Sequence, residues 1–131
     1  MDVRSKKLYK DMTKDERLLI EYRLENIHIK HFTRHTLDRM REKDISKFDI
    51  LNVLRSYSII EINHKEGTNP RVLLRGNIKD NRGYCTCISL DLISHKVITT
   101  YKNYSRDRHR TLDYNRYSNT IKIKDILIQN N

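Results

Sequence analysis

Histidine and arginine stand four residues apart at His35 and Arg39, in a stretch whose pattern predicts a helix. Side chains at this spacing lie on the same face of a helix. An imidazole can carry protons near neutral pH, and a guanidinium can hold a phosphate through two parallel hydrogen bonds. Metal-independent cleavage of RNA requires this combination of acid–base chemistry and bound phosphate. We therefore expect His35 to act as an acid or base and Arg39 as a phosphate clamp.

A second polar cluster lies far along the chain, between Tyr101 and Tyr117. It contains His109, whose neighbours Arg108 and Arg110 disfavour the protonated imidazole by like-charge repulsion. A neutral imidazole accepts a proton, and a tyrosine hydroxyl can donate one. Either His109 or Tyr117 is therefore expected to be the second catalytic proton carrier, opposite His35. The expected nucleic-acid contacts are the neighbouring cations Arg34, Lys102, Arg106, Arg108, Arg110 and Arg116.

These residues also allow simpler interpretations. His35 could be a surface histidine, and Arg39 could pair with Asp38, Glu42 or Asp44. Tyrosines interleaved with cations suit single-stranded RNA and a protein interface equally well. Two functions therefore stay open: a protein that binds RNA and, in the stronger form of the hypothesis, cleaves it, or a non-catalytic protein that docks onto and modulates a host or regulatory protein. DNA binding through a helix-turn-helix of residues 34–43 and 47–56 is a weaker third interpretation, because the second helix offers few polar positions to contact bases.

The composition favours a polyanionic partner. The chain has 131 residues, 27 Lys and Arg against 17 Asp and Glu, and a formal net charge of +10. A charge of this sign most often serves nucleic acid. No apolar run approaches the roughly 18 residues of a membrane span, and no signal-peptide segment follows Met1. We expect a cytoplasmic protein that does not bind membranes.

The two cysteines, Cys85 and Cys87, are expected to be free thiols on one side of a strand. Residues two apart on a strand are at or beyond disulfide reach. A zinc site would need further ligands at suitable spacing, and the chain has no second cysteine pair. The sequence therefore predicts no metal and no cofactor.

Hydrophobic periodicity and capping signals predict a single α+β domain over residues 1–131. A flexible basic segment over 1–12 precedes a helix over 13–26, which Thr13 and Glu16 open as a capping box. The core, residues 27–131, begins with a short strand or extended link over 27–32. A helix from Thr33 or Thr36 and a third helix capped by Ser46 follow. A four- to five-stranded antiparallel sheet follows the helices, with strands expected near residues 59–62, 72–74, 84–90, 97–101 and 121–128.

The stretch from Phe32 to Ser46 resembles a known family. Its Phe-Thr-x-His-x-x-x-Arg-Met pattern, with Val97-Ile-Thr-Thr-Tyr101 downstream, is similar to the domain-of-unknown-function family 4258 over about residues 27–104. That family is similar in turn to BrnT-type and RelE-type ribonuclease toxins. The resemblance implies helices, a four-stranded antiparallel sheet and a toxin-like RNA-cleaving fold. Most members have no assigned activity, which keeps the docking function open.

The later polar pattern is similar to small phage-encoded relatives of the same family. The residues that carry this second similarity are Asn103, Asp107, His109, Thr111, Leu112, Asp113 and Tyr117. The resemblance therefore implies a phage or mobile-element origin for the protein.

Overall fold

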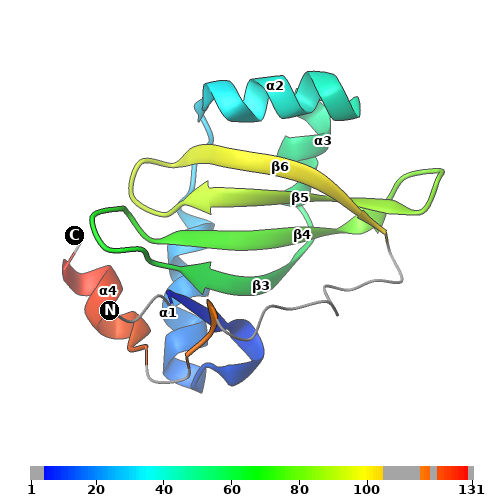
Figure 1. Cartoon of the computed structure of the whole chain (residues 1–131). Coiled ribbons are helices and arrows are strands. Elements are labelled where there is room, and N and C mark those ends of the chain that lie inside the picture. Colours follow the sequence, from blue (N-terminus) through cyan, green and yellow to red (C-terminus); the bar gives the residue numbers. More distant parts are fainter. Residues whose placement is uncertain (1–4, 105–115, 119–120, 130–131) are drawn as a thin grey trace.

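A computed structural model describes residues 5–104, 116–118 and 121–129 (Figure 1). Most of the helical segments precede a block of four consecutive strands, with short strands before and between them and a last helix after the sheet. In chain order the elements are β1 (Lys6–Leu8), the 3-10 helix η1 (Tyr9–Asp11), α1 (Lys14–Glu25), β2 (His31–Phe32), α2 (Arg34–Lys43), α3 (Lys47–Val53), β3 (Tyr57–Asn63), β4 (Arg71–Lys79), β5 (Tyr84–Asp91), β6 (Lys96–Tyr104) and α4 (Ile123–Gln129).

The sheet has six strands in the order β1-β3-β4-β5-β6-β2. The four strands from β3 to β6 form the expected antiparallel meander. The prediction of a purely antiparallel sheet of four to five strands is wrong at the edges. There β1 adds antiparallel to β3, and β2 adds parallel to β6. The fold is α+β as predicted, with a mixed sheet.

The helix starts follow the local capping signals. Thr13 and Glu16 form the predicted capping box of α1, and Ser46 and Asp49 form that of α3. Thr33 caps α2, and the Thr36 side chain donates to the carbonyl of Val97 in β6. The side chains of Thr13, Thr33 and Ser46 accept from backbone N–H groups that have no partner inside the helix. Thr33 and Thr36 therefore start α2 and fasten it to the sheet.

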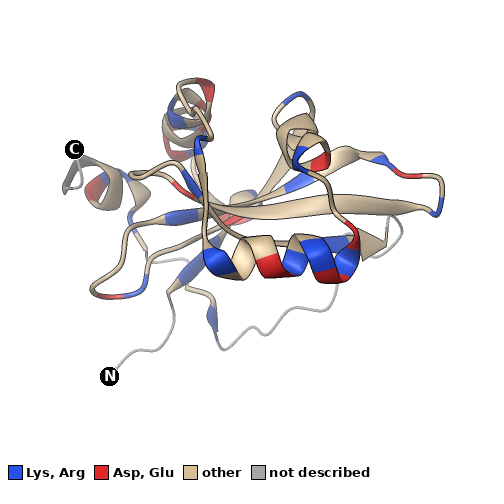
Figure 2. Ribbon diagram, turned by 90° about the horizontal axis from the view of Figure 1, so that it is seen from above, with Lys and Arg blue, Asp and Glu red and all other residues tan. Residues whose placement is uncertain are grey.

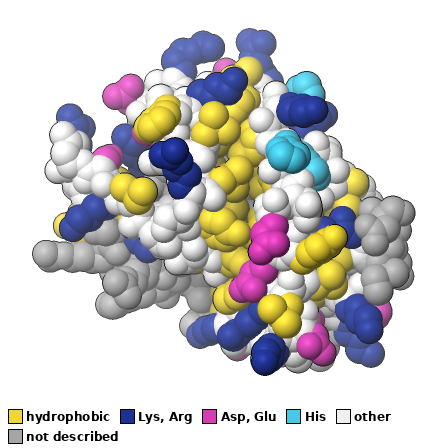
Figure 3. Space-filling model, turned by 180° about the vertical axis from the view of Figure 1, so that it is seen from behind, with side chains coloured by type: hydrophobic (Ala, Val, Ile, Leu, Met, Phe, Trp, Pro, Cys, Tyr) yellow, Lys and Arg dark blue, Asp and Glu magenta, His cyan; other side chains and the backbone are white. Residues whose placement is uncertain are grey.

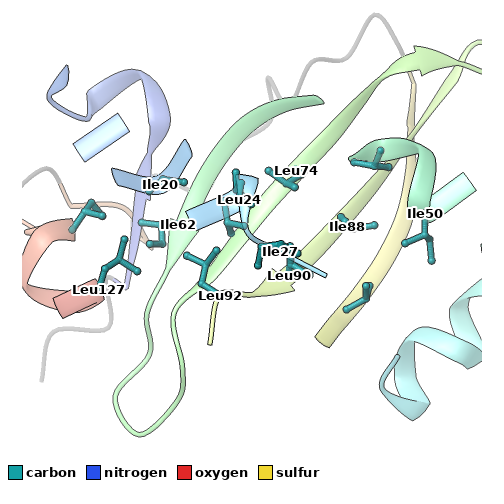
Figure 4. Packing of buried hydrophobic residues seen from close by; sticks show 14 of the residues in the cluster. Ile20, Leu24, Ile27, Ile50, Ile62, Leu74, Ile88, Leu90, Leu92 and Leu127 are labelled. Carbon is teal, nitrogen blue, oxygen red and sulfur yellow. The ribbon is translucent and has the colours of Figure 1, made fainter. Parts of the chain in front are cut away.

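The hydrophobic core fills the space between one face of the sheet and the helices (Figure 4). The meander contributes four fully buried side chains to this core, Ile62, Leu74, Ile88 and Leu90. Helices α1, α3 and α4 supply the facing side chains, among them Ile20, Leu24, Ile50 and Leu127. We call this side of the sheet the helix face and the opposite side the open face.

Both ends of the chain differ from the sequence prediction. Residues 1–12 are predicted to be flexible, but Lys6–Leu8 form an edge strand because their backbone pairs with β3. Residues 121–128 are predicted to form a strand, but 123–129 form α4. Ile123, Ile126 and Leu127 are buried at the spacing of one helix face, so burial favours the helical period over the local alternation. The expected order of helices followed by sheet therefore describes α1 to α3 and the meander, and the short strands β1 and β2 and the helix α4 depart from it.

Candidate functional site

The predicted histidine–arginine pair lies on the surface of α2. His35 is exposed, and Arg39 pairs with Glu42 at 3.2 Å, as the simpler interpretation of this arginine predicts. Arg34 makes a similar i,i+4 pair with Asp38 at 3.6 Å. Cations and carboxylates alternate along α2 in Figure 2. Since exposed pairs of this kind contribute little energy, both guanidiniums can exchange their carboxylates for a phosphate.

Tyr117 lies at the other edge of the sheet from α2. It forms an isolated bridge with Lys6 of β1, whereas α2 follows β2 directly. The strand order puts five inter-strand steps between these two edges, or roughly 24 Å at ordinary spacing. His35 and Arg39 therefore do not share a site with Tyr117.

The remaining predicted residues divide between the described and undescribed parts of the chain. Lys102 pairs with Asp80 at 3.7 Å, and Arg116 is exposed. His109 and the cations Arg106, Arg108 and Arg110 lie outside the described residues. Neither Cys85 nor Cys87 forms a disulfide, as predicted, and both thiols are buried.

The open face of the sheet gathers polar side chains from successive strands. Arg75 of β4, Cys87 of β5 and Tyr101 of β6 stand directly opposite one another in the strand register. Glu61 of β3 belongs to the adjacent row, because it is paired with Leu73, two residues before Arg75. Asn103 lies two residues beyond Tyr101 on the same face. Because side chains alternate between the two faces along each strand, these groups from four strands all lie on the open face.

Hydrogen bonds and ion pairs connect this open-face cluster, which we define as Lys6, Glu61, Arg75, Tyr101, Asn103 and Tyr117. The Tyr117 hydroxyl donates to Glu61 Oε1, and Lys6 Nζ lies 3.4 Å from Glu61 Oε2. The ammonium of Lys6 also lies 5.9 Å from the centre of the Tyr117 ring. On the other side of the cluster, Arg75 Nε donates to Asn103 Oδ1 at 3.0 Å.

Burial changes the acidity of the groups at the centre. Only 5% of Glu61 and 9% of Arg75 is exposed, while Tyr101 and Tyr117 are partly exposed. Burial raises the pKa of Tyr101, and the nearby Cys87 and Glu61 raise it further, so its hydroxyl keeps its proton. Burial also raises the pKa of the Cys87 thiol to about 12. Clustered groups with shifted acidity are typical of functional sites.

Sequence reasoning missed the two buried charged members of this cluster, Glu61 and Arg75. Glu61 stands in the apolar run Ile59-Ile-Glu-Ile62, and Arg75 ends the run Val72-Leu-Leu74. A charged residue inside a short apolar run is the signal that could have found them, because buried charges are rare unless they are paired. Among the described residues, no group of three or more side chains is placed to hold a metal ion.

The fold and this site define a small α+β protein with a polar cluster on the open face of a mixed sheet. A sequence model of the family Domain of unknown function (DUF4258) matches residues 32–102, which is more than half of the chain, so the protein belongs to that family. The match runs from β2 to β6. No curated protein and no solved structure matches the chain. None of the helices in the described residues is long and apolar enough to cross a membrane.

Proposed function

We propose that this protein binds RNA and cleaves it without a metal ion, and that the reaction takes place at the open-face cluster. The observation that carries the proposal is the contact of Tyr117 with Glu61, with Lys6 3.4 Å from the same carboxylate and Arg75 in the adjacent row of the open face. These side chains supply proton carriers and positive charge in one place. The net charge of +10 and the resemblance to RelE-type and BrnT-type toxins agree with an RNA substrate.

The arrangement assigns a role to each group in phosphodiester cleavage. The ribose 2′-oxygen attacks the adjacent phosphorus and gives its proton to Tyr117, which passes its own hydroxyl proton to Glu61. The bond from phosphorus to the 5′-oxygen breaks, and the ammonium group of Lys6 protonates the leaving oxygen. Lys6 and Arg75 stabilise the negative charge on the phosphate. The products are a 2′,3′-cyclic phosphate and a 5′-hydroxyl end, and solvent restores the protons.

The surface of α2 extends the proposed RNA-binding region. Arg34 and Arg39 are exposed or half-exposed, and their carboxylate partners lie on the same helix. Phosphates that displace these carboxylates would release counterions, so that binding weakens as salt rises. His35 stands beside these cations and remains the competing candidate for the acid or base.

The test is incubation of purified protein with total RNA in the presence of EDTA, followed by analysis of the product ends. We expect Tyr117→Phe and Glu61→Gln to lower the cleavage rate about a hundredfold or more, the usual scale for general acid–base catalysis. His35→Ala should cleave as the wild type does. Thermal unfolding of each variant checks the fold, and loss of the hydrogen bond from Tyr117 to Glu61 should cost about 1 kcal/mol.

Each other outcome overturns part of the proposal. Loss of cleavage in His35→Ala alone would transfer the acid–base role to α2. Equal rates in all three variants would exclude both sites. Absence of cleavage by the wild type would exclude the ribonuclease, and a filter-binding measurement with the same RNA would then decide whether the protein binds RNA at all.

A further inference from the structure

A groove runs along α1 on the helix face of the sheet, opposite to the open-face cluster. Its walls and floor are formed by η1, α1 and the start of β3, and its volume is about 560 Å³. Figure 3 shows this side of the molecule, with a stripe of hydrophobic side chains and acidic groups at its border. The residues that line the groove are Tyr9, Glu21, Glu25, Tyr57, Ser58 and Ile59.

The exposed face of α1 continues the apolar surface of the groove. Leu18 and Tyr22 are 53% and 64% exposed, and they share a helical face with Glu21 and Glu25. On the same side of the sheet, α3 exposes Phe48. Large hydrophobic side chains gathered on one side of a small protein mark a surface that another molecule covers.

The charge of the groove is opposite to that of the protein as a whole. Glu21 and Glu25 line it, although the chain carries a net charge of +10. Glu25 is also the last residue of α1, where the helix dipole disfavours a carboxylate. The stability of the helix therefore does not account for a carboxylate at this position.

The spacing of the two carboxylates indicates the shape of the partner. Glu21 and Glu25 are four residues apart, which is about 6 Å along the axis of α1. Lysines or arginines four residues apart on a second helix have the same separation. The apolar side of that helix would then cover Ile59, Tyr57 and the exposed side chains of α1. This is the helix-in-groove mode of recognition, with charges that fix the register.

We infer that the groove between α1 and β3 docks a basic amphipathic helix of a partner protein. The acidic lining selects against RNA, so this surface is separate from the proposed nucleic-acid site. The proposal does not depend on catalysis. A variant without ribonuclease activity, such as Tyr117→Phe, should bind the helix as the wild type does.

The probe for this site is a fluorescein-labelled peptide of Leu, Ala and Lys, about 18 residues long so that it can form a helix. Its leucines lie on one face and its lysines stand four residues apart on the border. Fluorescence anisotropy should show saturable binding to the wild-type protein. A matched peptide with Glu in place of Lys should bind at least about tenfold more weakly.

Two charge reversals of the same kind test the role of the acidic groove, one inside the groove and one outside it as a control. Glu25→Lys should weaken binding of the Lys peptide about tenfold and leave the fold intact, because the helix dipole favours a cation there. Glu66→Lys makes the same change on an exposed loop and should have no effect. Equal effects of both variants would reduce the interaction to net charge and overturn the proposal, as would absence of saturable binding.

A variant of the apolar surface distinguishes two occupants of the groove, a helix of a partner protein and a second copy of this chain. Tyr22→Ser should weaken peptide binding while the wild-type protein sediments as a monomer. A concentration-dependent dimer that Tyr22→Ser abolishes would overturn the proposal, because the groove would then be covered by self-association.

Discussion

Side chains alternate between the two faces of the sheet along each strand, and the two faces differ in composition and in role. On the helix face, Val72 and Leu74 of β4 are fully buried among apolar side chains from the helices. On the open face, Arg75 from the same strand donates a hydrogen bond to Asn103, and Cys87 lies between Arg75 and Tyr101 in the register. Apolar contacts stabilise the first face through loss of water from its surface. A buried ionic cluster is a weak source of stability, so the second face is better explained by function.

The largest expected difference between the faces is the effect of truncating neighbouring leucines of β4. Leu74 is fully buried on the helix face, and Leu73 is half-buried on the open face. Leu74→Ala should lower the free energy of unfolding by about 2–5 kcal/mol, because it leaves a cavity in the core. Leu73→Ala should cost less than half as much. Urea denaturation measures both, and equal costs would show that the open face is packed like a core.

A smaller effect is expected where α3 approaches the helix face most closely. A Cβ atom added at Gly76 would lie 3.1 Å from the Thr86 carbonyl oxygen and 3.3 Å from Val53 Cγ2. Gly76→Ala should therefore destabilise the protein by up to about 3 kcal/mol through overpacking. In the double variant with Val53→Ala, part of this cost should be recovered. A purely additive result in thermal unfolding would show that α3 does not limit the space at Gly76.

The smallest effect concerns an ionic group at the rim of the helix face. Glu16 accepts hydrogen bonds from Lys7 Nζ and from the N–H groups of Thr13 and Ile123. Burial by itself would raise the pKa of this carboxyl, but the bonds from Thr13, Ile123 and Lys7 hold the pKa below its usual value. Glu16→Gln should thus lower the free energy of unfolding at neutral pH by about 1.5 kcal/mol.

The pH dependence of this effect follows from the direction of the shift. Because the pKa of Glu16 is lower in the folded state, its contribution is complete above the unfolded pKa and is lost as the pH falls through the folded pKa. The difference between wild type and Glu16→Gln should stay constant above about pH 5 and shrink below about pH 4. A difference that grew on acidification would contradict this role of the carboxylate.

The sequence correctly predicted the helix starts that depend on contacts between residues close together in the chain. Thr13 and Ser46 cap their helices through contacts within three residues, so these starts could be read directly from the sequence. The strand β1 could not be predicted in this way, because three residues form a strand only when β3 offers them partners. The helix α4 was missed because Ile121 and Ile123 suggest alternation, and only burial of Ile126 and Leu127 favours the helical period.

The sequence likewise predicted one part of the candidate site and missed another. The sequence predicted Tyr117 as a proton carrier, and its catalytic role stays a prediction, but its partner Glu61 was not found. These two residues come together because the segment of Tyr117 bridges to β1, which in turn pairs with β3. No spacing in the sequence contains that information, since the contact joins residues 56 positions apart.

The sequence by itself determined the charge of the protein, the caps of its helices, the antiparallel meander and the family to which it belongs. These properties depend on composition, on short-range hydrogen bonds and on the period of apolar residues. Only the tertiary structure decided that His35 and Tyr117 lie at opposite edges of the sheet, and that Glu61 and Arg75 face the same side as Tyr117. The reason is that strand order and register are set by long-range pairing and burial.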